Sequence, residues 1–307
     1  MNQKLSMSLS DWLLLLILST FFGGAFFFVV IAVDEIPPLT LALCRCGIAA
    51  AVLLAYVWAK GQSLPSDFAV WRGLVILALL NTVLPFTLIF WGQQHIPSGL
   101  AAILNATAPL FSILLAHFAT ADEKLTTRRA LGVAVGFVGV VIVIGIDALW
   151  AVGLNVLAQL AVVAAAFCYA ATGVYGRRFQ RFPSAVIAAS VLLLGGLMLI
   201  PIAGFVDRPW QLPAPSLAAV ASTIGLAVVS TAFAFLIFFR LLARTGATNL
   251  QLVAFLIPVS AILLGVGFLG EVLEWRHFAG MALIATGLAI IDGRPERLLR
   301  RALLQEA

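Results

Sequence analysis

The sequence predicts an all-α membrane protein with ten transmembrane helices in two inverted five-helix repeats. Three observations predict this fold: long apolar runs with little charge, an uneven distribution of Lys and Arg among the loops, and similarity between the two halves. Hydrophobic residues make up 63% of the 307 residues and charged residues only 10%, whereas soluble domains carry about 25% charged residues. Lipid is therefore the expected solvent, and ten spans leave no room for a separate soluble domain.

Each apolar run is long enough for one helical span, which needs roughly 20 residues. Loops rich in Pro, Gly and charged residues separate the runs. The predicted spans are residues 12–33, 39–59, 70–92, 98–119, 129–147, 154–176, 184–206, 216–239, 247–269 and 276–292. The first run follows Lys4 and is too long for the apolar core of a signal peptide. We therefore interpret it as a retained first helix.

The loop charges predict the orientation. Nearly all of the 18 Lys and Arg residues lie in the N-terminal segment, in the loops after the even-numbered spans, or in the C-terminal segment. The opposite side holds only Arg208 and Arg276, and Arg45 lies within the second span. Cytoplasmic loops carry the excess of basic residues. We therefore expect a bacterial inner-membrane protein with both termini in the cytoplasm, an even number of spans, and a basic cytoplasmic tail at residues 294–307.

The halves, residues 1–147 and 148–293, resemble each other. Residues 86–109 align with residues 235–258. After a one-residue gap, a Glu, an Arg and a Gly follow at the same spacing in both halves: Glu123, Arg128 and Gly132 in the first, and Glu271, Arg276 and Gly280 in the second. Five spans are an odd number, so the second half must enter the membrane from the opposite side. Inverted repeats are typical of transporters, whose binding site lies near the midplane between the repeats.

Polar residues inside the spans are candidates for a solute pathway because a buried amide without a partner costs several kcal/mol. Aromatic residues on the same helices would suit stacking on an aromatic or bulky apolar solute. The alternative is that these residues only join or pack helices. The candidates for the cavity wall are Thr20, Asn81, Phe86, Trp91, Asn105, Tyr169, Ser230, Gln251 and Phe255.

Arg45 has two possible roles. It can brace the C-terminal carbonyls of a neighbouring helix, or it can attract a substrate carboxylate. Pro109 and Pro258, matched by the repeat, are expected to kink their helices and act as hinges. All 13 acidic residues map to termini, loops or span ends, which argues against a midplane carboxylate proton relay and favours a neutral or zwitterionic solute.

Enzymatic chemistry finds no support in the sequence. It contains no zinc-type HExxH motif, no P-loop and no Gly-rich dinucleotide turn. The three Cys residues lie within apolar runs, so neither a disulfide nor a metal site is expected. We expect no cofactor and no nucleic-acid partner, because topology explains the net charge of +5. The expected partners are a small-molecule solute and lipid, and a monomer is favoured over a dimer.

The chain has ten predicted spans, an inverted repeat, the segment Phe22–Ala25 in span one, Arg45 in span two, and repeated segments that contain Pro and Glu. In this combination it resembles the drug/metabolite transporter superfamily of EamA type. Within it, the chain is most similar to YddG-type bacterial exporters. The resemblance implies export of aromatic and other neutral amino acids, with tolerance for aromatic cations such as methyl viologen. Phe22 replaces the tryptophan that usually precedes the glycine in span one, so contacts of that span do not transfer directly.

Two other functions remain open at this stage. The protein could export a different metabolite, such as a nucleobase, a sugar or a cysteine-pathway compound. It could also be a receptor or scaffold that transports nothing, for which a sizeable extramembrane domain would be expected.

Overall fold

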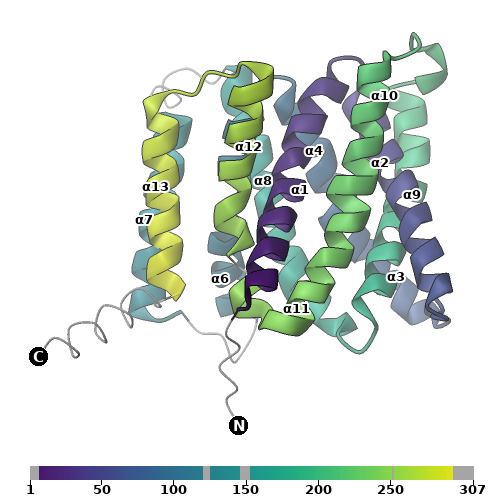
Figure 1. The fold of residues 1–307 in the computed structure, drawn as a ribbon, viewed down its shortest axis with the longest axis horizontal. Helices are drawn as coiled ribbons and strands as arrows, with labels where there is room; N and C mark the ends of the chain where they lie inside the picture. The colour runs from purple at the N-terminus through teal and green to yellow at the C-terminus, as the bar shows by residue number, and fades with distance from the viewer. Residues whose placement is uncertain (1–6, 120–124, 146–152, 251, 293–307) are drawn as a thin grey trace, which may run out of the picture.

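The computed structural model describes residues 7–119, 125–145, 153–250 and 252–292, and within these ranges the regular structure is entirely helical (Figure 1). Residue 251, the predicted tail at 294–307 and Glu123 lie outside the described residues. The helices stand side by side and roughly parallel to one another, and the two ends of the described chain lie on the same face of the bundle.

The first half consists of α1 (Leu9–Val33), α2 (Pro38–Ala59), α3 (Phe68–Ala78), the π-helical turn η1 (Leu79–Val83), α4 (Leu84–Gln93), α5 (Ser98–Asn105), α6 (Ala108–Ala119) and α7 (Thr127–Ile144). The helix starts are capped by local sequence. Ser8 and Asp11 form a capping box at α1, and the Asp67 carboxylate accepts from the Ala69 N–H at α3. Segments α3, η1 and α4 form one continuous span.

The second half consists of α8 (Leu154–Tyr175), η3 (Gly176–Phe179), α9 (Ser184–Val206), η4 (Pro209–Gln211), α10 (Leu217–Ile224), the π-helical segment η5 (Gly225–Phe233), α11 (Ala234–Leu250), α12 (Val253–Leu269) and α13 (Trp275–Asp292). Helix α11 is bent at Gly246, which has φ 77° and ψ 164°. Such positive φ values favour glycine because it has no Cβ.

Most of the predicted spans appear as helices close to the expected bounds. Eight helical segments in the described part of the chain are long and apolar enough to cross a membrane, and α12 is a shorter apolar helix of 17 residues. Helix α13, where the tenth span was predicted, packs along α7. The protein is thus a multi-pass membrane protein, while the count of ten spans stays a prediction.

The halves pack on each other with two-fold regularity. Helix α1, the first span of the first half, packs against η5 and α12 of the second half, and α8, the first span of the second half, packs against α4, α5 and α6 of the first. The second spans α2 and α9 pair with each other, as do α7 and α13. Each half therefore completes the other, which is the arrangement expected of inverted repeats.

Glycines allow the closest of these contacts. A Cβ atom at Gly139 of α7 would lie 2.7 Å from the Gly280 carbonyl oxygen of α13, and one at Gly132 would lie 2.6 Å from the Gly287 carbonyl oxygen. Small residues let membrane helices approach closely, so packing contacts replace the hydrophobic effect that lipid cannot supply. Large apolar side chains are instead exposed on the outside of both halves, where lipid solvates them.

Three carboxylates connect the halves on the face opposite the chain ends. Glu35 accepts from the backbone N–H and the hydroxyl of Ser216 at the start of α10, both at 2.6 Å. Asp207 accepts from the Thr40 N–H of α2 at 2.7 Å. Glu271 accepts from the Ser98 N–H of α5 at 2.7 Å. Each carboxylate thus caps a helix of the other half, where the N-terminal dipole favours a negative charge. We call these three contacts the carboxylate caps.

Candidate solute-binding cavity

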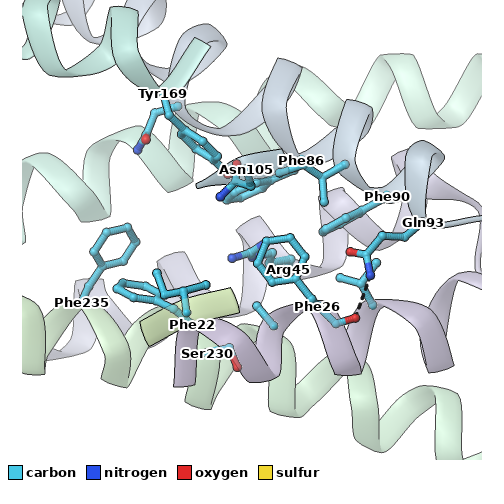
Figure 2. Close-up of a pocket in the computed structure, with 15 residues that line it drawn as sticks. Phe22, Phe26, Arg45, Phe86, Phe90, Gln93, Asn105, Tyr169, Ser230 and Phe235 are labelled. Atoms are coloured by element: carbon cyan, nitrogen blue, oxygen red, sulfur yellow. Dashed lines mark hydrogen bonds between the residues drawn. The ribbon is translucent and has the colours of Figure 1, made fainter. Parts of the chain in front are cut away.

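A cavity of about 240 Å³ lies between the two halves (Figure 2). Ligand sites commonly have volumes of roughly 300–1,000 Å³, so this cavity suits a small solute. Its wall consists of Phe22, Ala25, Phe26, Val29, Arg45, Asn81, Phe86, Ile89, Phe90, Gln93, Asn105, Tyr169, Ser230, Phe235 and Ile257. The wall is mostly aromatic and aliphatic, interrupted by amides, two hydroxyls and one guanidinium. No Asp or Glu is among these residues.

The spacing of the wall residues explains how two helices build most of the apolar surface. On α1 the wall residues lie three and four positions apart, at Phe22, Ala25, Phe26 and Val29. On α4 the same spacing is repeated by Phe86, Ile89, Phe90 and Gln93. Residues at these intervals share one face of a helix. Each helix therefore presents a single continuous stripe to the cavity. The Phe86 and Phe90 rings are stacked, with centroids 6.0 Å apart.

Arg45 is buried in this wall, with 9% of its surface exposed. Its Nε–H donates to the Thr231 hydroxyl of η5 at 2.9 Å, so a residue of the first half is held by the second. The guanidinium carbon lies 3.9 Å from the centroid of the Phe86 ring. Cation–π contacts of this kind partly compensate for lost hydration. Among the described residues, Arg45 forms no ion pair with an acid.

The π-helical segments contain two polar pairs that occupy equivalent positions when residues 86–109 are aligned with residues 235–258. Asn81 and Thr82 lie in η1, and Ser230 and Thr231 lie in η5. The Thr231 hydroxyl donates to the Leu226 carbonyl five residues earlier, at 2.8 Å. Wider turns of this kind frequently occur at functional sites. In both halves the wider turn brings one polar residue of the pair, Asn81 or Ser230, to the cavity wall.

The two polar pairs have different neighbours. Thr231 contacts Arg45 of α2. Thr82 occupies the corresponding place in the first half, but it packs against Gly195 of α9, where a Cβ atom would collide with the Thr82 hydroxyl. The pseudo-symmetric arrangement therefore carries a charge on one side only, and this makes the cavity asymmetric.

Several neutral polar groups of the wall have no hydrogen-bond partner among the described residues. They are the Gln93 Oε1, Asn105 Oδ1 and Ser230 Oγ atoms, all buried. Gln93 uses its other end, since its Nε2 donates to the Phe26 carbonyl of α1 at 2.8 Å. Buried polar atoms normally have partners, so these atoms are available to a bound solute or to water.

The structure brings together six of the residues singled out from the sequence. The predicted residues that line the cavity are Asn81, Phe86, Asn105, Tyr169, Ser230 and Arg45. Three others do not. Thr20 is exposed and donates to the Leu16 carbonyl of its own helix, Trp91 packs edge-on against His95, and Phe255 packs against the hydrophobic core. Gln251 lies outside the described residues.

Thr20 and Trp91 lie outside this wall because one step along a helix turns a side chain by about 100°. Trp91 immediately follows Phe90 and so leaves the stripe of α4. The same stripes contain the wall residues that the sequence reasoning did not select, namely Phe22, Phe26, Phe90 and Gln93. Their spacing of three and four residues was the signal that could have found them.

The matched prolines differ in their surroundings. The fourth span is interrupted at Ala106 and Thr107, between Asn105, the last residue of α5, and Ala108, the first residue of α6. Proline has no N–H to donate and is tolerated in the first turn of a helix, which is where Pro109 lies. Pro258 lies within α12, which continues through it. Their proposed role as hinges stays a prediction.

Two interlocked repeats that enclose an amphipathic cavity define the class of small-solute membrane transporters. The model of the EamA-like transporter family matches residues 10–145 and again residues 156–292. The chain therefore belongs to the EamA-like transporter family.

Known relatives agree with this assignment. The uncharacterized inner membrane transporter YedA of Escherichia coli K12 is 26% identical over 266 residues, which cover 85% of this chain and 83% of YedA. A probable terminal-alkyne amino-acid exporter of Streptantibioticus cattleyicolor is 29% identical over 67% of this chain and 68% of its own length. A protein of known crystal structure has the same fold, with a TM-score of 0.63 at 21% identity over 92% of this chain and 95% of that one.

Proposed function

We propose that this protein exports small amphipathic metabolites from the cytoplasm, above all aromatic and other neutral amino acids. The observation that carries the proposal is the cavity between the halves, with its aromatic stripes and its few unpaired polar groups. Stacking on Phe22, Phe86 and Phe235 would suit an aromatic side chain. The similarity to a probable amino-acid exporter supports the same solute class.

The mechanism we propose is alternating access, in which the halves rock about the cavity so that it opens to one side of the membrane at a time. The protein acts in the inner membrane as a monomer with both termini in the cytoplasm, an orientation that the basic loops favour. Because the cavity wall holds no carboxylate, we propose that transport needs no obligatory Asp or Glu protonation step.

The test is a counterflow assay with the purified full-length protein in liposomes. Liposomes are loaded with one unlabelled compound and take up labelled phenylalanine only if both are substrates. We expect phenylalanine, tryptophan and leucine inside the liposomes to drive uptake above that of protein-free liposomes. Uptake driven only by a nucleobase, a sugar or cysteine, tested with the matching labelled compound, would contradict the amino-acid assignment. Flux that needs an imposed proton gradient, and that nothing else can drive, would contradict transport without an obligatory Asp or Glu protonation step.

A further inference from the structure

The guanidinium of Arg45 is only partly used by the protein. Its Nε–H is committed to Thr231 and one face of the group lies against Phe86. No hydrogen bond from its two terminal nitrogens to another described residue is present, although the side chain is nine-tenths buried in the cavity wall. Figure 2 shows Arg45 in the middle of the wall, between Asn105 and Ser230.

A buried cation without a counter-ion is costly, and an anion that pairs with it in good hydrogen-bond geometry offsets this cost. The planar fork of the terminal nitrogens matches the two oxygens of a carboxylate. Nothing else in the described wall can neutralise the charge, because the remaining polar groups are amides and hydroxyls. The two terminal nitrogens of the guanidinium therefore fit the carboxylate of a solute.

The other unpaired atoms of the cavity wall could bind a second group of the solute, its amino group. The Asn105 Oδ1, Gln93 Oε1 and Ser230 Oγ atoms can each accept a hydrogen bond and have no donor in the described structure. An amino group supplies such donors. Neutral acceptors do not cancel the charge of Arg45, however, so an amine or a cation alone would meet an uncompensated positive charge.

We propose that Arg45 binds the carboxylate of the transported solute, and that the cavity consequently rejects aromatic amines and aromatic cations of the same size. This inference rests on the proposed function and deepens it, because it limits the substrates to compounds that carry a carboxylate. It also runs against transport of methyl viologen, which the family resemblance had implied. Since Thr231 holds Arg45 in place, the carboxylate is bound where the two halves meet.

The first experiment needs only the natural protein. Counterflow of labelled phenylalanine in liposomes is measured in competition with 3-phenylpropionate, phenethylamine, phenylalaninol and methyl viologen. We expect competition by 3-phenylpropionate, and at least about 10-fold weaker competition by the three compounds without a carboxylate, as the loss of one charge-assisted hydrogen-bonded pair predicts. Equal competition by phenethylamine or methyl viologen would overturn the proposal.

The second experiment uses Arg45→Gln and Arg45→Lys, with Arg72→Gln as the matched control, because Arg72 is exposed and lies outside the cavity wall. The melting temperature of the full-length protein in detergent is measured with and without each compound. We expect Arg45→Gln to bind phenylalanine about 10- to 100-fold more weakly and to lose its preference over phenylalaninol, while Arg45→Lys keeps part of that preference. A purely structural Arg45 would lower the melting temperature without changing the preference, and this result would overturn the proposal.

The two experiments also separate failure of this inference from failure of the proposed function. Counterflow of amino acids that is indifferent to the carboxylate would overturn the inference alone. Stabilisation by 3-phenylpropionate that Arg45→Gln abolishes, without counterflow of any amino acid, would overturn amino-acid export and leave the carboxylate site standing.

Discussion

Asn105 shows how a single residue comes to serve the cavity. It is the last residue of α5, and the span is interrupted at Ala106 and Thr107 before α6 begins at Ala108. Its Oδ1 is buried without a partner in the described structure, and the residue lines the cavity. Asn105 thus meets the cavity at the point where the fourth span is interrupted.

We expect Asn105→Ala to weaken phenylalanine binding by about 2- to 10-fold, since a neutral hydrogen bond contributes about 0.5–1.5 kcal/mol. The measurement is the half-saturating concentration for counterflow. Thr20→Ala is the matched control, because Thr20 is exposed and bonded within its own helix. A larger effect of Thr20→Ala than of Asn105→Ala would contradict the cavity described here.

At the scale of elements, the contact between α1 and α12 depends on the absence of a side chain at Gly23. A Cβ atom there would collide with the Ser260 hydroxyl and would lie 2.9 Å from the Ala261 N and Ile257 O atoms. Ser260 also donates to the Ser19 carbonyl of α1 at 2.8 Å, so the two helices are joined by a hydrogen bond as well as by close packing.

Gly23→Ala should therefore destabilise the protein by about 1–3 kcal/mol, the usual cost of overpacking. Gly267→Ala is its matched control, because Gly267 lies in α12 with open space where a Cβ would be. There the change should be neutral or stabilising, since alanine favours helix by about 1 kcal/mol over glycine. Thermal unfolding in detergent measures both. Equal melting temperatures for the two variants would contradict the packing.

At the scale of the whole molecule, the carboxylate caps hold the halves together on the face opposite the chain ends. The Ser216 hydroxyl and N–H that donate to Glu35 lower the pKa of its carboxyl below the ordinary value of 4.5. A lowered pKa means that this cap contributes its full stability above pH 4.5. The contribution falls as the pH drops from 4.5 through the lowered value. The cap is therefore intact at neutral pH.

The Glu271 cap joins the second half to the start of α5 in the first half. Glu271→Gln keeps the shape of the side chain but weakens its bonds to the Ser98 and Gly99 N–H groups. We expect hydrogen exchange of the peptide covering residues 94–100 to become about 3- to 10-fold faster, as measured by mass spectrometry.

Glu274→Gln is the matched control on the same face, because Glu274 pairs with Arg276 two residues away in its own half. It should leave exchange of that peptide unchanged. An identical effect of both substitutions would show that general surface charge, and not the cap, controls exchange.

The sequence by itself determined that the protein crosses the membrane and that it consists of two repeats. Apolar runs predicted the membrane helices, and the matched segments predicted two repeats, because lipid imposes length and composition on every span. It also pointed to Asn81, Asn105, Tyr169 and Arg45, since polar groups are rare in such spans.

Only the tertiary structure decided which face of each helix meets the cavity. In lipid both faces of a span are apolar, so composition does not separate the wall from the outer surface. The position of Thr20 and Trp91 outside this cavity wall could therefore not be read from the sequence. The partners of Arg45 were also beyond the sequence. Thr231 follows it by 186 residues, and only the packing of η5 against α2 brings the hydroxyl to the guanidinium while leaving the other side of that charge open to a solute.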